Sequence, residues 1–258
     1  MKFSTPCLTC AKEHMNGNAS EFPPQQYFEL NDDFFYEVQC EKGHKSVFWL
    51  QLHRFEALMD YGLWALKLEL PDAAVLKFYT ALEDFRIYFL RCWLHEHAPD
   101  QESQVSNNEF VRSQLKGLNR SELQKGAFKL VLGLEKARSK NEIAPTDNEQ
   151  KWVQMRNKIA HEGKLVSASY AETYCQEILD FIIDCINFLQ RTIPHGIGKA
   201  NLDIMMFCNQ RLEGLDPEIP NGTVALPSAI GPMSENMPKI KIKDAIDKIV
   251  KSGTFLQP

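Results

Sequence analysis

The stretch "MRNKIAHEG", residues 155 to 163, places an arginine, an amide and a titratable histidine close together, as Arg156, Asn157 and His161. Arginine binds phosphate oxygens through two parallel N–H donors. Histidine transfers protons, and an asparagine amide donates or accepts a hydrogen bond. In combination, these side chains suit chemistry at a phosphate group, where anion binding, proton transfer and stabilisation of developing charge are all required.

Residues 149 to 161 are predicted to form the helix that carries these side chains. At about 100° per residue, Arg156 falls within the apolar arc around Trp152. A buried arginine requires an anion as its partner. That anion is either a ligand phosphate or an internal carboxylate, for which Glu83 and Asp84 are the candidates. In the second case Arg156 makes only a core salt bridge.

Gly163 is the predicted end of this helix, so His161 lies in the last turn, where the helix dipole favours positive charge. The competing interpretation is that His161 only caps backbone carbonyls. Five residues correspond to about 140° around a helix. We therefore expect that Arg156 and His161 of one chain do not meet on one phosphate, and that a second chain related by a two-fold axis supplies the convergence.

A second constellation lies near the start of the chain, where "CLTC" contains Cys7 and Cys10 and "CEKGH" contains Cys40 and His44. Two short turns that each supply two ligands are typical of a tetrahedral zinc site. His14 is the competing fourth ligand, and free thiols with a fortuitous spacing are the alternative to any metal. Three thiolates and one imidazole predict a closed, structural Zn²⁺ site.

The spacing of apolar residues along the chain predicts the helices and strands that position these side chains. Residues 1 to 50 contain aromatic and β-branched runs between turn residues, which predicts a small β-rich, zinc-ribbon-like unit without a core of its own. From residue 51 the apolar period becomes helical. We expect a polar loop between the central helix and a broken helical region, and Pro194 as the end of the last long helix. The predicted helices cover residues 51–70, 72–97 (central), 108–138 (broken), 149–161 and 169–193.

The chain is accordingly predicted to be mainly α, with a helical bundle over residues 51 to 195 and a C-terminal extension over residues 196 to 258. Beyond residue 215, five prolines within 24 residues predict an extended linker or a tail on the surface. The stretch "KIKDAIDKIVKSG" is predicted to be a short amphipathic helix.

Composition limits the classes of function. The 258 residues are 44% hydrophobic and 24% charged, with a net charge of −5, which disfavours a general nucleic-acid coat and leaves room only for local contact. No stretch is long and apolar enough for a membrane span, so we expect no membrane partner and a cytoplasmic protein. The seven cysteines are odd in number, and four lie in apolar helical stretches, which predicts reduced, buried thiols. These four are Cys92, Cys175, Cys185 and Cys208.

The motif "MRNKIAHEG", together with the long central helix containing "AVLKFYTALEDFRIYFL" and the long helix that follows, resembles the HEPN (higher eukaryotes and prokaryotes nucleotide-binding) superfamily. The resemblance covers about residues 51 to 195. It implies a helical bundle that dimerises so that both motifs share one composite site. It further implies Arg156 and His161 as catalytic residues, with Asn157 in support.

Many members of this superfamily are metal-independent endoribonucleases of toxin, CRISPR or anti-phage systems. The resemblance therefore implies RNA as the substrate, no metal for catalysis, a homodimer, and an antitoxin or defence-system protein as a further partner. Attack of the ribose 2′-hydroxyl would leave a 2′,3′-cyclic phosphate and a 5′-hydroxyl. Two alternatives remain: a catalytically silent interaction module, and a nucleotide-binding partner of a nucleotidyltransferase.

Overall fold

The computed structural model describes residues 2–17, 25–98, 104–139, 145, 149–224, 228–230, 233 and 236–252. Over these residues the chain is mainly α-helical with a small β region near the N-terminus, as predicted. The elements are β1 (Lys2–Pro6), α1 (Leu8–Met15), β2 (Gln25–Glu29), β3 (Phe35–Gln39), β4 (Lys45–Leu50), α2 (Arg54–Lys67), α3 (Pro71–His97), α4 (Gln104–Lys116), α5 (Ser121–Arg138), α6 (Glu149–Glu162), α7 (Ala168–Thr192), α8 (Pro194–Leu212), β5 (Asn221–Val224) and α9 (Ile242–Ser252).

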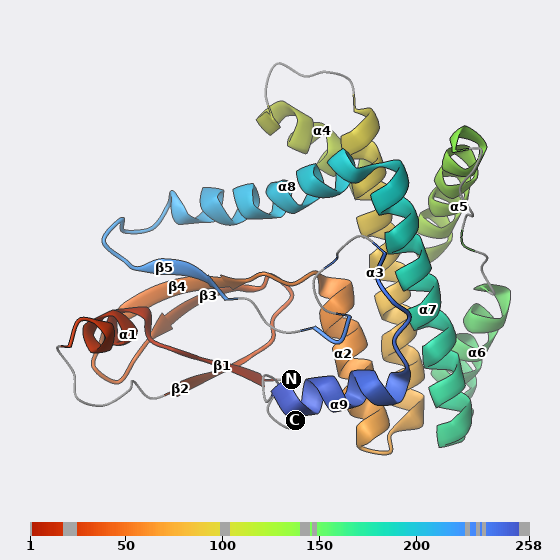
Figure 1. Ribbon diagram of the computed structural model, residues 1–258, viewed down its shortest axis with the longest axis horizontal. Coiled ribbons are helices and arrows are strands. Elements are labelled where there is room, and N and C mark those ends of the chain that lie inside the picture. The colour runs from red at the N-terminus through yellow and green to blue at the C-terminus, as the bar shows by residue number, and fades with distance from the viewer. Residues whose placement is uncertain are drawn as a thin grey trace.

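Helix α3 is the centre of the bundle, and α2, α4, α5, α6, α7 and α8 all pack against it (Figure 1). Pro71 begins α3 at a position where its missing N–H costs no hydrogen bond. The contact with α2 is close because Gly62 has no side chain. A Cβ added at Gly62 would lie 2.5 Å from the Phe78 ring, so this glycine sets the distance between the two helices.

The apolar stripe predicted for the last part of the bundle is confirmed in α7. The Ser167 hydroxyl accepts a hydrogen bond from the Tyr170 backbone N–H and caps the helix at its start. One whole side of the helix is buried against α3 and its neighbours. The buried members of the predicted stripe are Tyr174, Ile178, Phe181, Ile182, Cys185 and Phe188.

The prediction that Pro194 ends the last long helix was wrong in one respect, because Pro194 begins the 19-residue helix α8. Proline is tolerated in the first turn of a helix, so it ends one helix and begins another. Gly196 lies against α3, where an added Cβ would come within 2.2 Å of the Cys92 carbonyl oxygen. The polar loop was also predicted too long, since α4 already begins at Gln104.

The N-terminal strands form two small sheets, of which β1 and β2 are one antiparallel pair. In the second sheet β4 lies between β3 and β5, and β5 runs parallel to β4 with Val47 opposite Asn221. The expectation that this unit has no core of its own was wrong. Phe3 is fully buried, with its ring 5.0 Å from that of Tyr36 and 5.8 Å from that of Phe48.

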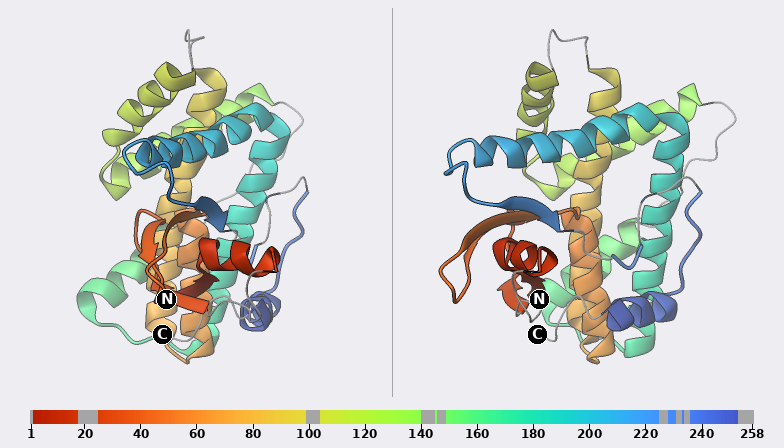
Figure 2. Two further views of the ribbon diagram at one scale, coloured as in Figure 1. Left: turned by 90° about the vertical axis from the view of Figure 1, so that its left-hand side faces the viewer. Right: turned by 60° about the vertical axis from the view of Figure 1, so that its left-hand side comes forward.

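Helix α8 and strand β5 connect this unit to the bundle. The other face of the β3–β4–β5 sheet buries Phe35, Val47 and Trp49 against Cys208 of α8, and α8 runs from the bundle across the sheet (Figures 1 and 2). Part of the predicted C-terminal extension therefore packs against both the helical bundle and the N-terminal sheet. The reason is that β5 satisfies its backbone hydrogen bonds on β4.

The segment before α9 is attached to α7 by two amide side chains. Asn187 donates to the Met237 carbonyl (2.9 Å) and accepts from its N–H (2.7 Å). Gln176 bonds in the same way with the Ile240 carbonyl (2.9 Å) and the Ile242 N–H (2.7 Å). Helix α9 is amphipathic, as predicted. Its buried residues are Ile242, Ala245 and Ile249. Several residues of the proline-rich stretch lie outside the described residues.

The four cysteines predicted to be reduced and buried are free and buried. Among the described helices, none has the length and apolar character that crossing a membrane requires.

Candidate functional site

The predicted residues Arg156, Asn157 and His161 lie together on α6. The Arg156 Nη1 donates to the Asn157 Oδ1 at 3.0 Å and lies 3.3 Å from the His161 Nε2. Arg156 is half-buried, whereas Asn157 and His161 are exposed. The two side chains of one chain therefore contact each other although they lie about 140° apart around the helix, because the arginine side chain is long. That the two do not close on one phosphate stays a prediction.

The end of α6 supports this geometry. Helix α6 ends at Glu162, and Gly163 follows with a φ of 65°, which is a conformation that glycine adopts without strain. The Lys164 backbone N–H then returns to the Lys158 carbonyl at 3.1 Å. His161 therefore lies in the last turn, as predicted, and its ring is exposed at the end of the helix.

The guanidinium of Arg156 rests on an aromatic ring of the central helix. Its central carbon lies 5.7 Å from the centroid of the Tyr79 ring, and Tyr79 itself is only 3% exposed. A cation above a ring face is attracted to the ring quadrupole without losing its hydrogen-bond donors. Tyr79 thus packs against Arg156 without using the hydrogen-bond donors of the guanidinium.

Neither of the carboxylates considered as internal partners meets Arg156. Asp84 pairs with Arg54 at 2.8 Å, and Glu83 accepts a hydrogen bond from the Ser121 hydroxyl. Within the described part of the chain, Arg156 forms no ion pair with a carboxylate. Among the described residues, the contacts of its guanidinium are with the Tyr79 ring, Asn157 and His161.

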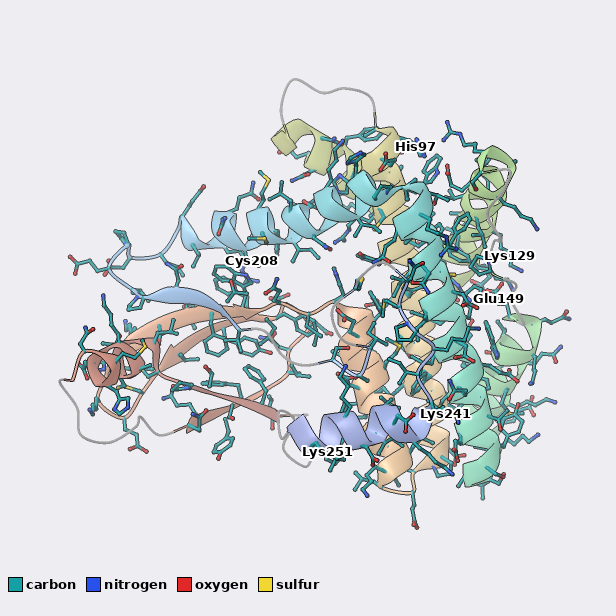
Figure 3. All side chains as sticks on the ribbon, viewed as in Figure 1. His97, Lys129, Glu149, Cys208, Lys241 and Lys251 are labelled. Carbon is teal, nitrogen blue, oxygen red and sulfur yellow. The ribbon has the colours of Figure 1, made fainter. Side chains whose placement is uncertain are left out.

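The buried arginine of this region is a different residue, which the sequence analysis missed. Arg86 of α3 is 1% exposed and lies 2.6 Å from Glu149, which is also buried. Lys129 and Lys125 of α5 approach the second oxygen of Glu149 at 2.9 Å and 3.6 Å. Figure 3 shows Lys129 and Glu149 at the junction of α5 and α6. The sequence does contain a signal that predicts a buried arginine, because Arg86 lies within the apolar run "EDFRIYFL".

The middle of α6 is fixed on α7. The Trp152 indole N–H donates to the Glu177 carboxylate at 3.0 Å, and the Tyr174 hydroxyl donates to the Trp152 carbonyl at 3.0 Å. Trp152 is 1% exposed, with its ring 5.5 Å from that of Phe181. Glu149 and Trp152 therefore attach the first half of α6 to the neighbouring helices, whereas in the second half Arg156 is half-buried and His161 is exposed.

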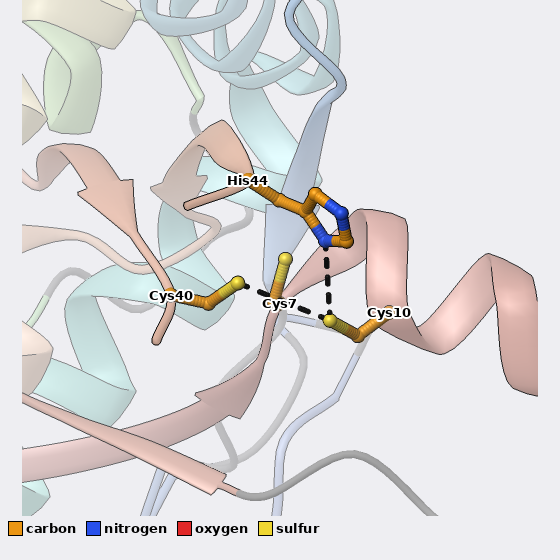
Figure 4. Close-up of side chains that lie close together, drawn as sticks. All are labelled: Cys7, Cys10, Cys40 and His44. Carbon is orange, nitrogen blue, oxygen red and sulfur yellow. Dashed lines mark hydrogen bonds between the residues drawn. The ribbon is translucent and has the colours of Figure 1, made fainter. Parts of the chain in front are cut away.

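The predicted metal ligands Cys7, Cys10, Cys40 and His44 form one cluster, with one ligand atom from each residue and all four atoms within 4.8 Å of one another (Figure 4). Sγ of Cys10 lies 3.9 Å from Sγ of Cys40 and 3.4 Å from Nδ1 of His44. His14 is not a member of the cluster. The arrangement can bind a metal ion, and His44 is the histidine that it contains.

Two turns position these ligands. Cys7 precedes α1 and Cys10 lies in its first turn. The turn between β3 and β4 is closed by the Cys40 N–H donating to the His44 carbonyl at 3.0 Å, with Gly43 at a φ of 83°. Local backbone geometry therefore brings the ligands together in pairs. The sheet and α1 then bring the two pairs face to face.

The distances suit a small tetrahedral ion. A tetrahedron with bonds of about 2.3 Å to sulfur has edges of about 3.8 Å, close to the observed separation of Cys10 and Cys40. Burial raises the pKa of Cys7, but hydrogen bonds from the Cys10 backbone and Ser46 outweigh it and lower this pKa to about 7. Burial and the neighbouring thiols raise the pKa of Cys10 to about 11. One thiol is thus readily ionised, and a cation favours ionisation of the others.

A further group of buried titratable side chains lies where α2 meets the segment before α9. Burial raises the pKa of Glu56 to about 7, although the backbone of His53 and the hydroxyl of Ser228 stabilise its charged form. Burial also raises the pKa of Asp60 well above its usual value, although its carboxylate accepts from the Ala229 N–H at 3.0 Å. This group attaches the segment before α9 to α2.

Comparison of the chain with protein-family models, with curated proteins and with solved structures found no match. The residues themselves therefore define the site: an arginine, an amide and a histidine in contact on an exposed helix end, and a separate three-cysteine, one-histidine cluster in the β-rich unit.

Proposed function

We propose that the chain is a metal-independent endoribonuclease of the HEPN type, in which Arg156 and His161 act on the scissile phosphate and Asn157 orients the arginine. The observation that carries this proposal is the contact of the three side chains at the exposed end of α6. Arg156 forms no ion pair there with a carboxylate of the described residues. A cation so placed is suited to an external anion, and phosphate matches its planar donors.

The reaction proceeds by attack of a ribose 2′-oxygen on the adjacent phosphorus. The O2′–P bond forms, the P–O5′ bond breaks, and the products are a 2′,3′-cyclic phosphate and a 5′-hydroxyl. His161 takes the proton from the 2′-hydroxyl, and a second acid returns a proton to the leaving 5′-oxygen. Arg156 stabilises the charge that develops on the non-bridging oxygens.

Two chains supply the two proton-transferring groups in this mechanism. Each chain has one histidine in the cluster, whereas the cleavage step needs both a base and an acid. A homodimer with two α6 helices facing one cleft provides a histidine for each role. The same arrangement lets two Arg156 side chains bind one phosphate backbone.

The test is cleavage of labelled RNA by zinc-loaded protein with EDTA present in the reaction, followed by a measurement of retained zinc. Arg156→Ala and His161→Ala should each lower the rate at least about 100-fold. Lys158→Ala is the matched control, because Lys158 is an exposed cation on the same helix. Equal cleavage by all variants would end the proposal.

A second arm identifies the nucleophile. An oligonucleotide with 2′-deoxyribose at the cut position should resist cleavage there, because the attacking hydroxyl is missing. Cleavage at the substituted position would exclude this mechanism, even with the arginine and histidine in place.

The metal cluster has a structural role in this proposal. We take zinc as its ion, because three sulfur ligands and one imidazole match zinc chemistry and complete a closed tetrahedron without an open position. A toxin or anti-phage role, with an antitoxin or defence-system partner, rests on the resemblance to the HEPN superfamily.

A catalytically silent interaction or nucleotide-binding module is the second candidate. One observation favours it, which is that Nε2 of His161 is already occupied by the Arg156 guanidinium. Such a module would gain thermal stability from added nucleotide without cleaving RNA.

A further inference from the structure

Two buried carboxyl groups lie one helical turn apart on α2 and face the segment before α9. Glu56 is 6% exposed and Asp60 is fully buried. The Ala229 N–H donates to Oδ1 of Asp60 at 3.0 Å, and the Ser228 side chain stabilises the charged form of Glu56. Residues 228–230 are themselves buried, so this short segment covers the carboxyl pair, by which we mean Glu56 and Asp60.

The carboxyl pair is buried without a cation in direct contact. Within the described part of the chain, neither carboxyl group forms an ion pair, and Oδ2 of Asp60 has no hydrogen-bond partner. Lys248 of α9 is close enough to favour the charged form of Asp60, but its Nζ donates to the Ala229 carbonyl at 3.1 Å instead. A buried carboxyl group that lacks a paired cation is more stable when protonated, and two neighbouring carboxylates also repel each other.

Three further titratable or charged groups lie close to the pair. The His53 backbone N–H donates to Oε2 of Glu56 at 2.8 Å, and burial lowers the pKa of the His53 ring to about 4. Burial raises the pKa of Tyr88, on α3, well above its usual value. Both rings are therefore uncharged between pH 6 and pH 9. The Arg91 guanidinium near them stays positively charged in this range, so any change of charge among these groups comes from Glu56 and Asp60.

We propose that protonation of the carboxyl pair holds residues 228–230 on α2, and that loss of these protons releases the segment while the helical bundle stays folded. A released segment lets water reach both carboxylates. The contact between α2 and α3 stays closed, because it is formed by tightly packed groups that carry no charge, such as Gly62 and Phe78. This pH-dependent contact uses none of the residues of the proposed nuclease reaction.

The direction of the pH dependence follows from burial. Burial raises the pKa of Glu56 to about 7 and that of Asp60 well above its usual value. In the released form both carboxyl groups meet water, where their pKa values are about 4. The closed form therefore has its full advantage below about pH 4 and loses it as the pH rises through about 7.

Helix α9 is held by separate contacts, which do not involve the carboxyl pair. Gln176 and Asn187 of α7 bond through their side-chain amides to the backbone of residues 237–242. Amide groups do not change their charge with pH. We therefore expect α9 to stay on α7 when residues 228–230 leave α2.

The experiment is backbone hydrogen exchange, measured by mass spectrometry on the zinc-saturated chain at pH 6 and pH 9. Protection is expressed relative to the unfolded chain at the same pH, which removes the chemical effect of pH on exchange. Protection of residues 228–230 should fall at least about tenfold from pH 6 to pH 9. The Ala229 amide reports directly, because it is the donor to Asp60. Unchanged protection of the segment would overturn the proposal.

Low urea concentrations distinguish local release from unfolding of the whole chain. Local opening exposes little surface, so exchange of residues 228–230 at pH 9 should hardly depend on urea. Exchange in α7 should be slower and should rise with urea, and α9 should also exchange more slowly than the segment. Exchange of the segment only together with α7 or α9 would reject the local release.

Glu56→Gln combined with Asp60→Asn removes both titrating protons, so protection of residues 228–230 should be the same at pH 6 and pH 9. Asp84→Asn is the matched control and should keep the fall in protection. Burial also raises the pKa of Asp84, but this carboxylate pairs with Arg54 rather than with the segment. The same fall in the double variant would overturn the proposal. If that variant does not fold, the urea measurement on the unsubstituted chain decides alone.

Discussion

The Nη1 of Arg156 lies 3.3 Å from the Nε2 of His161, and the same nitrogen donates to Asn157. A guanidinium has only donors, so a hydrogen bond between the two side chains requires the imidazole to accept through Nε2. An arriving phosphate competes with His161 for the arginine. In the proposed reaction, binding of the phosphate therefore releases the histidine nitrogen that then takes the proton from the 2′-hydroxyl.

The planar guanidinium is expected to matter more than its charge. Arg156→Lys keeps the positive charge but loses the paired donors that contact Asn157, His161 and phosphate. We expect RNA cleavage to fall roughly 10- to 100-fold with little change in thermal stability, because the side chain is only half-buried. Single-turnover kinetics with Lys158→Arg as the control measure this difference. Unchanged cleavage by Arg156→Lys would contradict the assigned role.

The metal cluster is expected to bind one zinc ion per chain. Elemental analysis should find the ion in the unsubstituted protein and little of it in Cys40→Ser, because three remaining ligands leave the tetrahedron open. His14→Ala should retain the metal, since His14 lies outside the cluster.

Strong chelators should also lower the melting temperature of the unsubstituted protein. A full complement of zinc in Cys40→Ser would show that the cluster is not the binding site.

The stability of the folded chain is expected to fall when one partner of the Arg86–Glu149 ion pair is removed. Arg86→Met leaves a buried carboxylate with only Lys125 and Lys129 near it, and we expect a destabilisation of about 3–5 kcal/mol. Urea unfolding measures this change, and the double variant Arg86→Met with Glu149→Gln should recover part of the loss. Arg54→Ala, at an exposed ion pair, should cost about 1 kcal/mol or less. Equal losses of stability for Arg86→Met and Arg54→Ala would argue against a buried ion pair at Arg86.

The carboxyl group of Glu56 gives the folding stability a pH dependence. Burial raises its pKa from 4.5 to about 7, so the folded chain retains a proton that the unfolded chain releases. The resulting stabilisation is present below pH 4.5 and is lost as the pH rises through about 7. Each tenfold change in the acid constant corresponds to about 1.4 kcal/mol, which gives a total of about 3 kcal/mol.

Glu56→Gln should remove this dependence. Urea unfolding between pH 5 and 8.5, with zinc saturating, compares the two proteins. Burial lowers the pKa of the neighbouring His53 to about 4, which adds a slope of opposite sign, but in both proteins alike. The free energy of unfolding of the unsubstituted protein should therefore fall relative to that of Glu56→Gln as the pH rises through about 7. A difference independent of pH would contradict the buried, protonated state of Glu56.

Features set by neighbouring residues could be predicted from the sequence. The α7 stripe follows from a repeat of 3.6 residues, the end of α6 from Gly163, and the metal cluster from two short turns that each supply two ligands. Arg156, Asn157 and His161 lie within one and a half helical turns, so their proximity also follows largely from local structure.

Features set by distant contacts required the tertiary structure. Helical periodicity placed Arg156 on an apolar arc, but the neighbouring helices bury Arg86 instead, because burial depends on which surfaces other elements cover. Strand β5 pairs with β4 across more than 170 residues, and its four residues carry no pattern of their own. The sequence by itself determined which side chains share a helix or a turn. Only the packing of α3, α5, α7 and α8 decided which of their charges are buried and paired and which remain exposed.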